Sequence, residues 1–392
     1  MRPLQLEAKC LQKMQARCAI EIESEAEKVE ASTSQAVRLV LSSLGGGGAE
    51  HVAVELCRQW AYDGVKIQVV LLREGGVRVG DLPASVELHV LNIKRARYCL
   101  PKLVLWEKRH GRCPTLVFGF EAAFAFAFGK SIGLLQSPLI FREGSLPEAN
   151  LSWARRLLYS LLLRNSDAVI VQSDSMIRRV GRRQKNAQKI IAIPNPVQAS
   201  LAPKNPEPDK AWEPREAVRL LSIGRLSPEK GFSELIEAFL SVHQARPGSA
   251  LIIYGEGKQR TQLEHLIAQN HLANAVRLPG YKRIDEMIWQ QADIFVLPSR
   301  YEGQPNALMQ AIAAGKRVIS TPASPATIDL LQACGLEEAM IACMQGKEFQ
   351  AKVDWCLAAP STQWSQASKN LFEMADAAGI AQRYLECFMR LR

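Results

Sequence analysis

The hydrophobic pattern of the chain changes near residue 36. Residues 1–35 carry a charged run at Glu21–Glu27 and few apolar positions, which predicts an N-terminal extension that is partly disordered. From Val37 onward, apolar runs of strand length alternate with stretches of helical period, such as the amphipathic Ala49–Tyr62. The predicted strands are Val37–Leu44, Lys66–Leu72, Val86–Leu91, Thr115–Phe118, Pro138–Phe141, Ala168–Val171 and Ile190–Ile193. A strand, a glycine loop, a helix and a second strand in succession predict a parallel α/β domain.

The same rhythm restarts after a proline-rich stretch. Six prolines fall between Pro194 and Arg215, which is typical of a linker. The strands predicted beyond it are Arg219–Ile223, Ala250–Tyr254, Val276–Leu278, Ile294–Leu297 and Arg317–Ser320, and helices are predicted at Ser233–Gln244 and Gln259–Asn270. The predicted organisation is an extension (1–35), a first Rossmann-like domain (36–195), a linker (196–215), a second Rossmann-like domain (216–375) and a C-terminal helix (376–392). Two doubly wound α/β domains of this kind place a ligand cleft between the carboxyl ends of their strands.

The composition is that of a globular protein, with 47% hydrophobic and 22% charged residues among 392. The longest apolar stretch, Leu116–Gly129, is too short to span a bilayer and contains Glu121. The N-terminus has no cationic start followed by an apolar core, so no secretory signal is predicted. The nine cysteines form no C-x-x-C pair, which argues against a zinc site or a disulfide framework. These features predict a cytoplasmic location.

The positive charge is concentrated in the first half of the chain. Residues 1–200 carry a net charge of +10, whereas residues 201–392 are neutral overall. Much of the excess lies in Lys94–Arg112, Trp153–Arg164 and Arg178–Lys189, and the second of these mixes tryptophan, leucine and arginine at helical spacing. Such a domain can rest on an anionic membrane surface, although leucines packed on the core with solvated arginines would give the same pattern. No nucleic-acid-binding motif is present.

Two loops carry the candidate chemistry. Gly224–Gly231 (Gly-Arg-Leu-Ser-Pro-Glu-Lys-Gly) follows a predicted strand and precedes a helix, so Arg225 and Lys230 flank a helix N-terminus suited to a diphosphate. By itself, a basic loop of this kind is as often a solvated turn. Ser299–Gly315 also follows a strand. Pro305 is predicted at the first position of a helix that Gly315 ends, so that the amides of Gln304, Asn306 and Ala307 lie at its positive end. Glu302 then either accepts hydrogen bonds from hydroxyl groups or caps the helix.

Taken together, these loops closely resemble the retaining glycosyltransferase family 4, which has the GT-B fold. The resemblance runs from about Val37 to Pro322 and includes further segments in the family's order. These are the glycine loop Leu41–Glu50, Ser166–Ser173 with Ile193–Val197, Tyr254–Gly257 and Val276–Tyr281.

The resemblance implies a metal-independent transferase that moves a sugar from a nucleotide sugar, expected to be a UDP-sugar, to a lipid-linked or membrane-proximal glycan, as in polysaccharide biosynthesis. Arg225 and Lys230 would neutralise the leaving diphosphate, and Glu302 would bind the hydroxyls of the transferred sugar. The donor-binding residues would be Gly224, Gly255, Gly280, Tyr281, Gly303, Gln304, Pro305, Asn306, Ala307 and Gln310. No cofactor is implied beyond the nucleotide sugar, and no Asp-x-Asp pair that would hold a metal lies near a strand end.

The acceptor side is assigned to the first domain. Gly46 and Gly47 match the family's glycine loop, and Phe141–Gly144 resembles an arginine-containing strand end in members that extend lipid-linked sugars. Arg142 would bind an acceptor phosphate and Glu143 would orient a hydroxyl, although an intradomain ion pair is an equal alternative. Glu121 is a further acceptor-side candidate. The expected partners are therefore the nucleotide sugar, the glycan acceptor and the inner face of the membrane.

The sequence departs from the family at Gln310, where members have a second glutamate that contacts the ribose. The segment Thr321–Leu330 also lacks the acid usual at its end. These departures favour, as the alternative, a catalytically silent GT-B paralogue that binds a glycan or a partner. An epimerase or a phosphorylase on the same fold is a third possibility, but no pyridoxal-phosphate lysine motif is recognisable.

Overall fold

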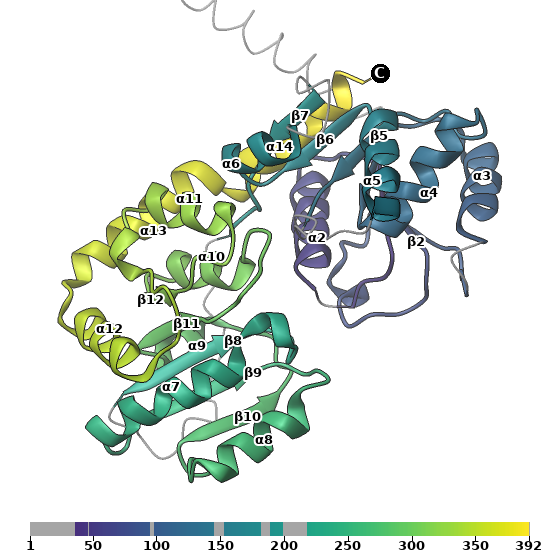
Figure 1. Cartoon of the computed structure of the whole chain (residues 1–392). Coiled ribbons are helices and arrows are strands. Elements are labelled where there is room, and N and C mark those ends of the chain that lie inside the picture. The colour runs from purple at the N-terminus through teal and green to yellow at the C-terminus, as the bar shows by residue number, and fades with distance from the viewer. Residues whose placement is uncertain are drawn as a thin grey trace, which may run out of the picture. The chain divides into compact units, whose positions relative to one another are not determined.

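A computed structural model describes residues 36–45, 47–94, 98–144, 153–181, 189–198 and 218–391 (Figure 1). The predicted extension 1–35, Gly46 and most of the predicted linker lie outside the described residues. The chain divides into two compact units, Met1–Leu139 with Leu391–Arg392, and Ile140–Arg390. This division falls inside the segment 36–195 that the sequence assigns to one domain, and the predicted domain boundaries stay a prediction.

The first unit is built from parallel strands and the helices between them. Its elements are β1 (Val37–Leu41), α2 (Gly48–Tyr62), β2 (Ile67–Leu71), the 3₁₀ turn η1 (Val79–Asp81), β3 (Glu87–Val90), α3 (Cys99–His110), β4 (Thr115–Phe118) and α4 (Phe120–Ser131). The strands pair in the order β3-β2-β1-β4, with Val37 opposite Ile67 and Arg38 opposite Thr115. Every residue of β1, β2 and β4 is buried, as expected for parallel strands covered on both faces.

The apolar stretch Leu116–Gly129 is split between two elements. Strand β4 ends at Phe118, Gly119 takes a positive φ of 84°, and helix α4 begins at Phe120. Glycine adopts this left-handed conformation without the steric cost that a Cβ imposes, so the chain turns directly from strand to helix. No helix among the described residues has both the length and the apolar character needed to cross a bilayer.

The second unit begins within β5 (Leu139–Arg142) and contains a complete doubly wound sheet. Its first elements are α5 (Trp153–Asn165), β6 (Ala168–Val171), α6 (Asp174–Gly181) and β7 (Ile190–Ala192), with β6 paired in parallel to β5 and β7. The next are β8 (Arg219–Ile223), η5 (Pro228–Lys230), α7 (Phe232–Ala245), β9 (Ala250–Tyr254), α8 (Arg260–Gln269), β10 (Val276–Gly280), α9 (Glu286–Gln291), β11 (Ile294–Leu297), α10 (Asn306–Ala313) and β12 (Arg317–Ser320). The last are α11 (Pro325–Ala333), η6 (Glu337–Ala339), α12 (Gly346–Ala358), α13 (Ser361–Ala375) and α14 (Ala377–Met389).

Strands β8 to β12 pair in parallel in the order β10-β9-β8-β11-β12. Helix α7 contacts both α8 and α12, α10 contacts α13, and one continuous hydrophobic core joins these helices to the sheet. The strand order reverses direction between β8 and β11, which is the topological switch point where open α/β sheets bind ligands. The strands predicted from the sequence agree with the structure to within three residues at each end.

The C-terminal helix α14 packs on elements at the start of the second unit. Arg383 Nη2 donates a hydrogen bond to the carbonyl of Ala192 at the end of β7 (2.5 Å). Tyr384 is fully buried and accepts a hydrogen bond from Arg142 Nε at the end of β5 (3.0 Å). Residues that lie 242 positions apart in the sequence are therefore fixed to each other.

Candidate functional site

The loops after β8 and β11 meet at the switch point of the second sheet. Lys230 Nζ lies 2.6 Å from Glu302 Oε1, and the amide of Arg300 donates to the carbonyl of Glu229 (2.8 Å). A Cβ on Gly231 would lie 2.1 Å from the carbonyl oxygen of Pro298, so the two backbones touch where a side chain has no room. The two loops that the sequence singled out, about 75 residues apart, thus form one structure.

Glu302 is held by two donors and by its own backbone. Ser299 Oγ donates to Glu302 Oε1 (2.7 Å), and the Glu302 amide donates to Ala323 (3.2 Å). The side chains of Glu302 and Lys230 are 12% and 24% exposed, so the pair is partly shielded from solvent. A carboxylate fixed in this way retains lone pairs for ligand hydroxyls. The ammonium of Lys230 is partly exposed, so that an anion at the switch point can reach it. Ser299 was not singled out from the sequence, although it opens the quoted segment.

Arg225 lies one residue beyond Gly224 in the loop after β8, and its side chain is exposed. The same loop contains Ser227, whose Oγ donates to Glu229 Oε1 (2.6 Å). This hydrogen bond lowers the pKa of Glu229. The sequence placed Arg225 and Lys230 in one loop, and the structure gives Lys230 a fixed partner while Arg225 faces solvent.

Glycines end the three strands on the other side of the switch point. The amide of Gly224 donates to Tyr254 (3.0 Å), and that of Gly255 donates to Gly280 (2.9 Å). A Cβ on Gly255 would lie 1.8 Å from the carbonyl oxygen of Gly224. Tyr281, the next residue after β10, is half exposed. The ends of β8, β9 and β10 are therefore held close together. The exposed ring of Tyr281 lies next to them and could stack on a flat base.

Helix α10 begins directly after the loop that holds Glu302. Pro305 is the N-cap residue and the helix begins at Asn306, so the prediction of Pro305 at the first helical position was wrong by one residue. The difference arises because Pro305 has an extended ψ of 103°. The helix ends at Ala313, and Gly315 takes a φ of 64°, as the sequence predicted. Ala307 and Gln310 lie on this helix, both half-buried.

Asn195, which the sequence did not single out, forms hydrogen bonds with three residues and is called the Asn195 hub below. Its backbone amide donates to Gln304 Oε1 (2.6 Å). Its side-chain amide donates to the carbonyl of Gln304 (3.1 Å) and to Asn306 Oδ1 (2.6 Å). The side chains of Gln304 and Asn306 therefore face Asn195, while their backbones continue into α10. Asn195 lies in the quoted motif Ile193–Val197, which was the available signal.

Arg142 and Glu143 lie at the end of β5, as predicted, and both are buried. The Arg142 guanidinium donates to Tyr384 Oη and to Asn195 Oδ1, so its nitrogens bind the protein itself. Glu143 accepts a hydrogen bond from Tyr159 Oη (2.8 Å). Binding of an acceptor phosphate by Arg142 stays a prediction. The residue is buried, and its protein partners would have to move before a phosphate could reach the guanidinium.

The Asn195 hub predicts a measurable coupling to donor binding. Replacing Asn195 with alanine removes its side-chain hydrogen bonds with Arg142, with the carbonyl of Gln304 and with Asn306, and loss of buried bonds of this kind costs about 1–3 kcal/mol. We expect the Kd for UDP to rise about tenfold and the melting temperature to fall. Calorimetric titration with UDP measures the first effect and a thermal melt the second.

A suitable control is Asn270→Ala, because Asn270 also donates from its side-chain amide to a carbonyl, that of Leu266 (2.9 Å), at the end of α8. The control is expected to leave UDP binding unchanged. Equal UDP affinity for the Asn195 variant and the unsubstituted protein would show that the hub does not position the loop.

The acceptor-side candidates of the first unit lie at its own switch point, between β1 and β4. Gly47 is the N-cap of α2, after β1, and Glu121 is in the first turn of α4, after β4. Glu121 is exposed, with its carboxylate 3.9 Å from Arg73. Gly46 lies outside the described residues. The structure thus places Gly47 and Glu121 at the starts of the helices that follow two neighbouring strands.

A partly buried charged cluster lies close to the glycine loop of the first unit, on α2 and η1. His51 Nδ1 lies 4.0 Å from Glu55 Oε1, and Arg58 Nη1 lies 2.7 Å from the same oxygen. Arg78 and Asp81 of the η1 segment are 3.5 Å apart, and Asp81 also lies 3.8 Å from Arg58. Burial, followed by the charges of Arg78 and Arg58, lowers the pKa of His51 to about 4, while Asp81 opposes this shift.

This pKa predicts a loss of stability in weak acid. The unfolded chain binds a proton at His51 near pH 6.5, whereas the folded chain does so only near pH 4. The free energy of unfolding therefore decreases as the pH falls from 6.5 to 4, by up to about 3 kcal/mol from this group. Urea unfolding of the protein and of His51→Gln at both ends of this range tests it. The variant should lose part of the dependence, His265→Gln on the exposed face of α8 should not, and identical profiles for all three would contradict the assignment.

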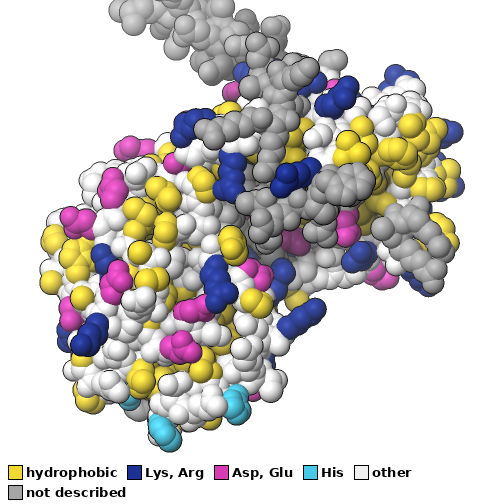
Figure 2. All heavy atoms as spheres, viewed as in Figure 1, with side chains coloured by type: hydrophobic (Ala, Val, Ile, Leu, Met, Phe, Trp, Pro, Cys, Tyr) yellow, Lys and Arg dark blue, Asp and Glu magenta, His cyan; other side chains and the backbone are white. Residues whose placement is uncertain are grey.

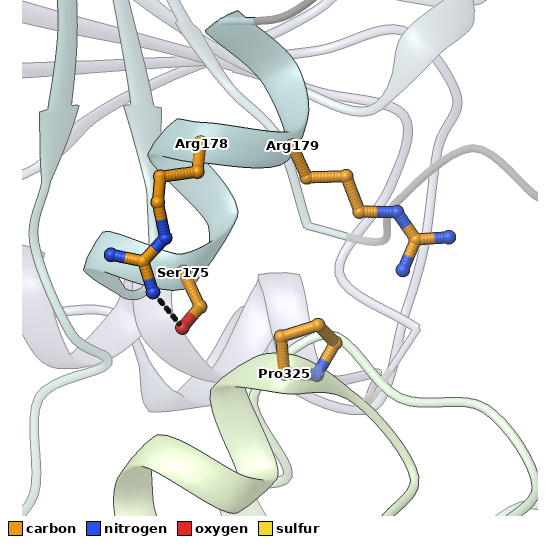
Figure 3. A pocket seen from close by; sticks show the side chains of 4 residues that line it. All are labelled: Ser175, Arg178, Arg179 and Pro325. Atoms are coloured by element: carbon orange, nitrogen blue, oxygen red, sulfur yellow. Dashed lines mark hydrogen bonds between the residues drawn. The ribbon is translucent and has the colours of Figure 1, made fainter.

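A cavity of about 310 Å³ lies between α6 and the start of α11 (Figure 3). It is lined by Ser175, Arg178, Arg179 and Pro325. Arg178 Nη2 donates to Ser175 Oγ (2.9 Å), which in turn donates to Asp329 Oδ1 (2.8 Å), whereas Arg179 extends away from this pair. The preceding residue, Ser324, caps α11 and donates to the carbonyl of Gly303 (2.6 Å), so this cationic cavity adjoins the loop of Glu302.

The fold is that of known sugar transferases. HepE of Anabaena, solved in complex with UDP and glucose, matches with a TM-score of 0.76 over 91% of this chain and 100% of that chain, at 18% identity. This likeness and the two parallel sheets define the GT-B fold, with two Rossmann-like domains. The family model "Glycosyl transferases group 1" matches residues 204–370, and "Glycosyltransferase Family 4" matches residues 46–201. The chain belongs to the group 1 glycosyltransferases of the GT-B fold, which confirms the resemblance found in the sequence.

Curated relatives match parts of the chain. The lipopolysaccharide core biosynthesis glycosyltransferase LpsE of Rhizobium meliloti is 26% identical over 279 residues, covering 70% of this chain and 76% of that protein. The GtfA subunit of a UDP-N-acetylglucosamine–peptide N-acetylglucosaminyltransferase of Streptococcus agalactiae is 34% identical over 110 residues, 28% of this chain and 22% of that protein. The chain spans less than half the length of the first three curated relatives that it matches, at 22%, 42% and 41%.

Proposed function

We propose that the protein transfers a sugar from a UDP-sugar to a glycan that is lipid-linked or close to a membrane, with retention of anomeric configuration and without a divalent metal. The observation that carries this proposal is the Lys230–Glu302 pair (2.6 Å) at the switch point, beside the N-terminus of α10. A cation, a carboxylate and a positive helix end are the three groups that an anionic leaving group and a hydroxylated sugar require. UDP and glucose in HepE, and the lipopolysaccharide role in the name of LpsE, support the donor and acceptor classes.

The residues suggest how the reaction is assisted. The bond between the anomeric carbon and the diphosphate oxygen breaks, positive charge develops on the sugar, and negative charge develops on UDP. Lys230, Arg225 and the amides at the start of α10 stabilise the leaving diphosphate, while Glu302 orients the sugar through its hydroxyls. The acceptor hydroxyl attacks from the face that the diphosphate leaves, and a departing phosphate oxygen takes its proton. Before this step Lys230 exchanges Glu302 for the phosphate, since one ammonium cannot hold both at full strength.

A screen of UDP-sugars with mass-spectrometric detection of products tests the activity, and proton NMR of the product's anomeric centre tests retention. We expect turnover that EDTA does not reduce. The proposal fails if UDP does not bind at millimolar concentration, or if every UDP-sugar binds without transfer to any glycan acceptor. Inhibition by EDTA would remove the metal-independent part alone.

Gln310 favours the second candidate, a GT-B protein that binds its ligand without turnover. Its amide accepts a ribose hydroxyl less strongly than a carboxylate would, by about 1–2 kcal/mol. We therefore expect Gln310→Glu to tighten UDP binding about tenfold, measured by calorimetry. A silent paralogue predicts binding without turnover in both forms, whereas the transferase predicts turnover in the unsubstituted protein.

A further inference from the structure

Exposed hydrophobic side chains are concentrated on two neighbouring helices of the first unit. Six of the fourteen large hydrophobic residues that are exposed in the described part of the chain fall between residues 98 and 134. They are Tyr98, Leu105, Phe120, Phe128, Ile132 and Leu134, between 38% and 50% exposed. These residues lie on helices α3 and α4 or next to their ends, and the two helices contact each other. Figure 2 shows hydrophobic side chains gathered over the region that α3 and α4 occupy in Figure 1, with lysine or arginine side chains at its edge.

The spacing on α4 gives this surface a regular aromatic edge. Phe120, Phe124 and Phe128 recur every fourth residue, and their rings stack at 6.1 Å and 6.3 Å between centroids. Residues at this spacing lie on one face of a helix. On the opposite face, Ala122 and Phe126 are buried. The helix therefore shows aromatic side chains on both faces, and its outer face continues into Ile132 and Leu134.

The exposed charges around this surface are cationic, with Glu121 as the exception. Lys108, Arg109 and Arg112 are exposed at the end of α3 and just beyond it. Of the acidic residues between 98 and 134, Glu107 is buried and accepts hydrogen bonds from the amides of Gln136 and Ser137, so only Glu121 is exposed. An apolar surface with a cationic edge complements an anionic lipid surface, where apolar side chains enter the headgroup boundary and cations bind the headgroups. A second copy of this surface would bring like charges together, which disfavours self-association.

We propose that the α3–α4 face is a docking surface for an anionic lipid bilayer. The face is defined by Leu105, Phe120, Phe128, Ile132 and Leu134 with Lys108, Arg109 and Arg112. The docking proposal rests on the proposed function in one respect, since a membrane-proximal acceptor would explain why the enzyme binds a membrane. Glu121, the acceptor-side candidate, lies on α4 itself, so docking brings that end of the helix to the lipid surface.

Vesicle flotation of the full chain tests the proposal. We expect binding to vesicles of phosphatidylcholine mixed with phosphatidylglycerol, and little binding to phosphatidylcholine alone. The double variant Phe128→Ser with Leu134→Ser should lower the partition coefficient about tenfold or more, since each removes exposed apolar area. Lys108→Glu with Arg109→Glu should do the same and remove the dependence on anionic lipid.

Matched controls separate the face from general properties of the chain. Tyr62→Ser removes an exposed apolar residue at the end of α2, and Lys347→Glu with Lys369→Glu makes the same change in net charge on exposed positions of α12 and α13. Both controls should bind vesicles as the unsubstituted protein does. Circular dichroism and UDP titration of every variant confirm that the fold is kept.

The proposal is overturned if the protein ignores anionic vesicles, or if the face variants bind them as well as the controls. It is also overturned if the face variants change the oligomeric state in the absence of lipid, because the face would then bind protein. Transfer to a soluble glycan acceptor, measured in parallel, distinguishes the two proposals. Vesicle binding without transfer counts against the proposed function alone, and transfer without vesicle binding counts against the docking surface alone.

Discussion

Replacing Lys230 with alanine is expected to lower the turnover number about 100-fold to 1000-fold. Lys230 is the cation that the structure fixes beside Glu302, at 2.6 Å, and loss of one fixed donor to a developing anion has this magnitude in other enzymes. Arg225→Ala should have a smaller effect, about tenfold, because its exposed guanidinium acts through solvent. Steady-state kinetics with a UDP-sugar measure both, and Lys347→Ala on α12 is the control expected to have no effect.

The partner of Lys230 makes the prediction sharper. Glu302→Gln removes the carboxylate that competes with the diphosphate for Lys230, so UDP itself should bind equally well or more tightly while turnover falls. Lys230→Ala should weaken both UDP binding and turnover. If both substitutions change UDP affinity in the same direction, exchange of Lys230 between the carboxylate and the diphosphate is wrong. Unchanged turnover in Lys230→Ala would remove its role altogether.

Gly231→Ala is expected to lower the free energy of unfolding by about 2–4 kcal/mol and to weaken UDP binding at least tenfold. Two costs add at this position. The φ of 67° disfavours any residue with a Cβ by about 1 kcal/mol, and the new Cβ would lie 2.1 Å from the carbonyl oxygen of Pro298. Backbone must shift to relieve such a contact, which typically costs about 1–3 kcal/mol. The shift would separate the loop of Lys230 from the loop of Glu302.

Gly315→Ala isolates the first cost, because Gly315 has nearly the same φ, 64°, but no atom within 4 Å of its Cβ position. We expect it to lose only about 1 kcal/mol and to keep UDP binding. Urea unfolding and calorimetric titration measure the two quantities. Equal destabilisation of both variants would mean that the contact with Pro298 relaxes freely and does not fix the loops.

Local pattern was enough to predict the elements and the donor loops. Apolar runs such as Ile294–Leu297 need burial on both faces, so they predict parallel strands wherever they occur. Glycines and prolines at strand and helix ends predict the turns, since their allowed backbone conformations are few. The meeting of the loops of Lys230 and Glu302 followed because each loop begins at the end of a strand, and the carboxyl ends of neighbouring parallel strands share one edge of the sheet.

Contacts over long sequence distances could not be predicted in this way. The sequence by itself determined the fold class, the family and the two loops that meet at the switch point of the second sheet. Only the tertiary structure decided that Arg142 turns to Tyr384 and Asn195, that Gln304 and Asn306 face Asn195, and that Phe120 and Phe128 of α4 remain exposed. The physical reason is that the period of a strand or helix determines the face on which a side chain lies. The residue that this side chain contacts belongs to another element, which can lie as far as 242 positions away in the sequence.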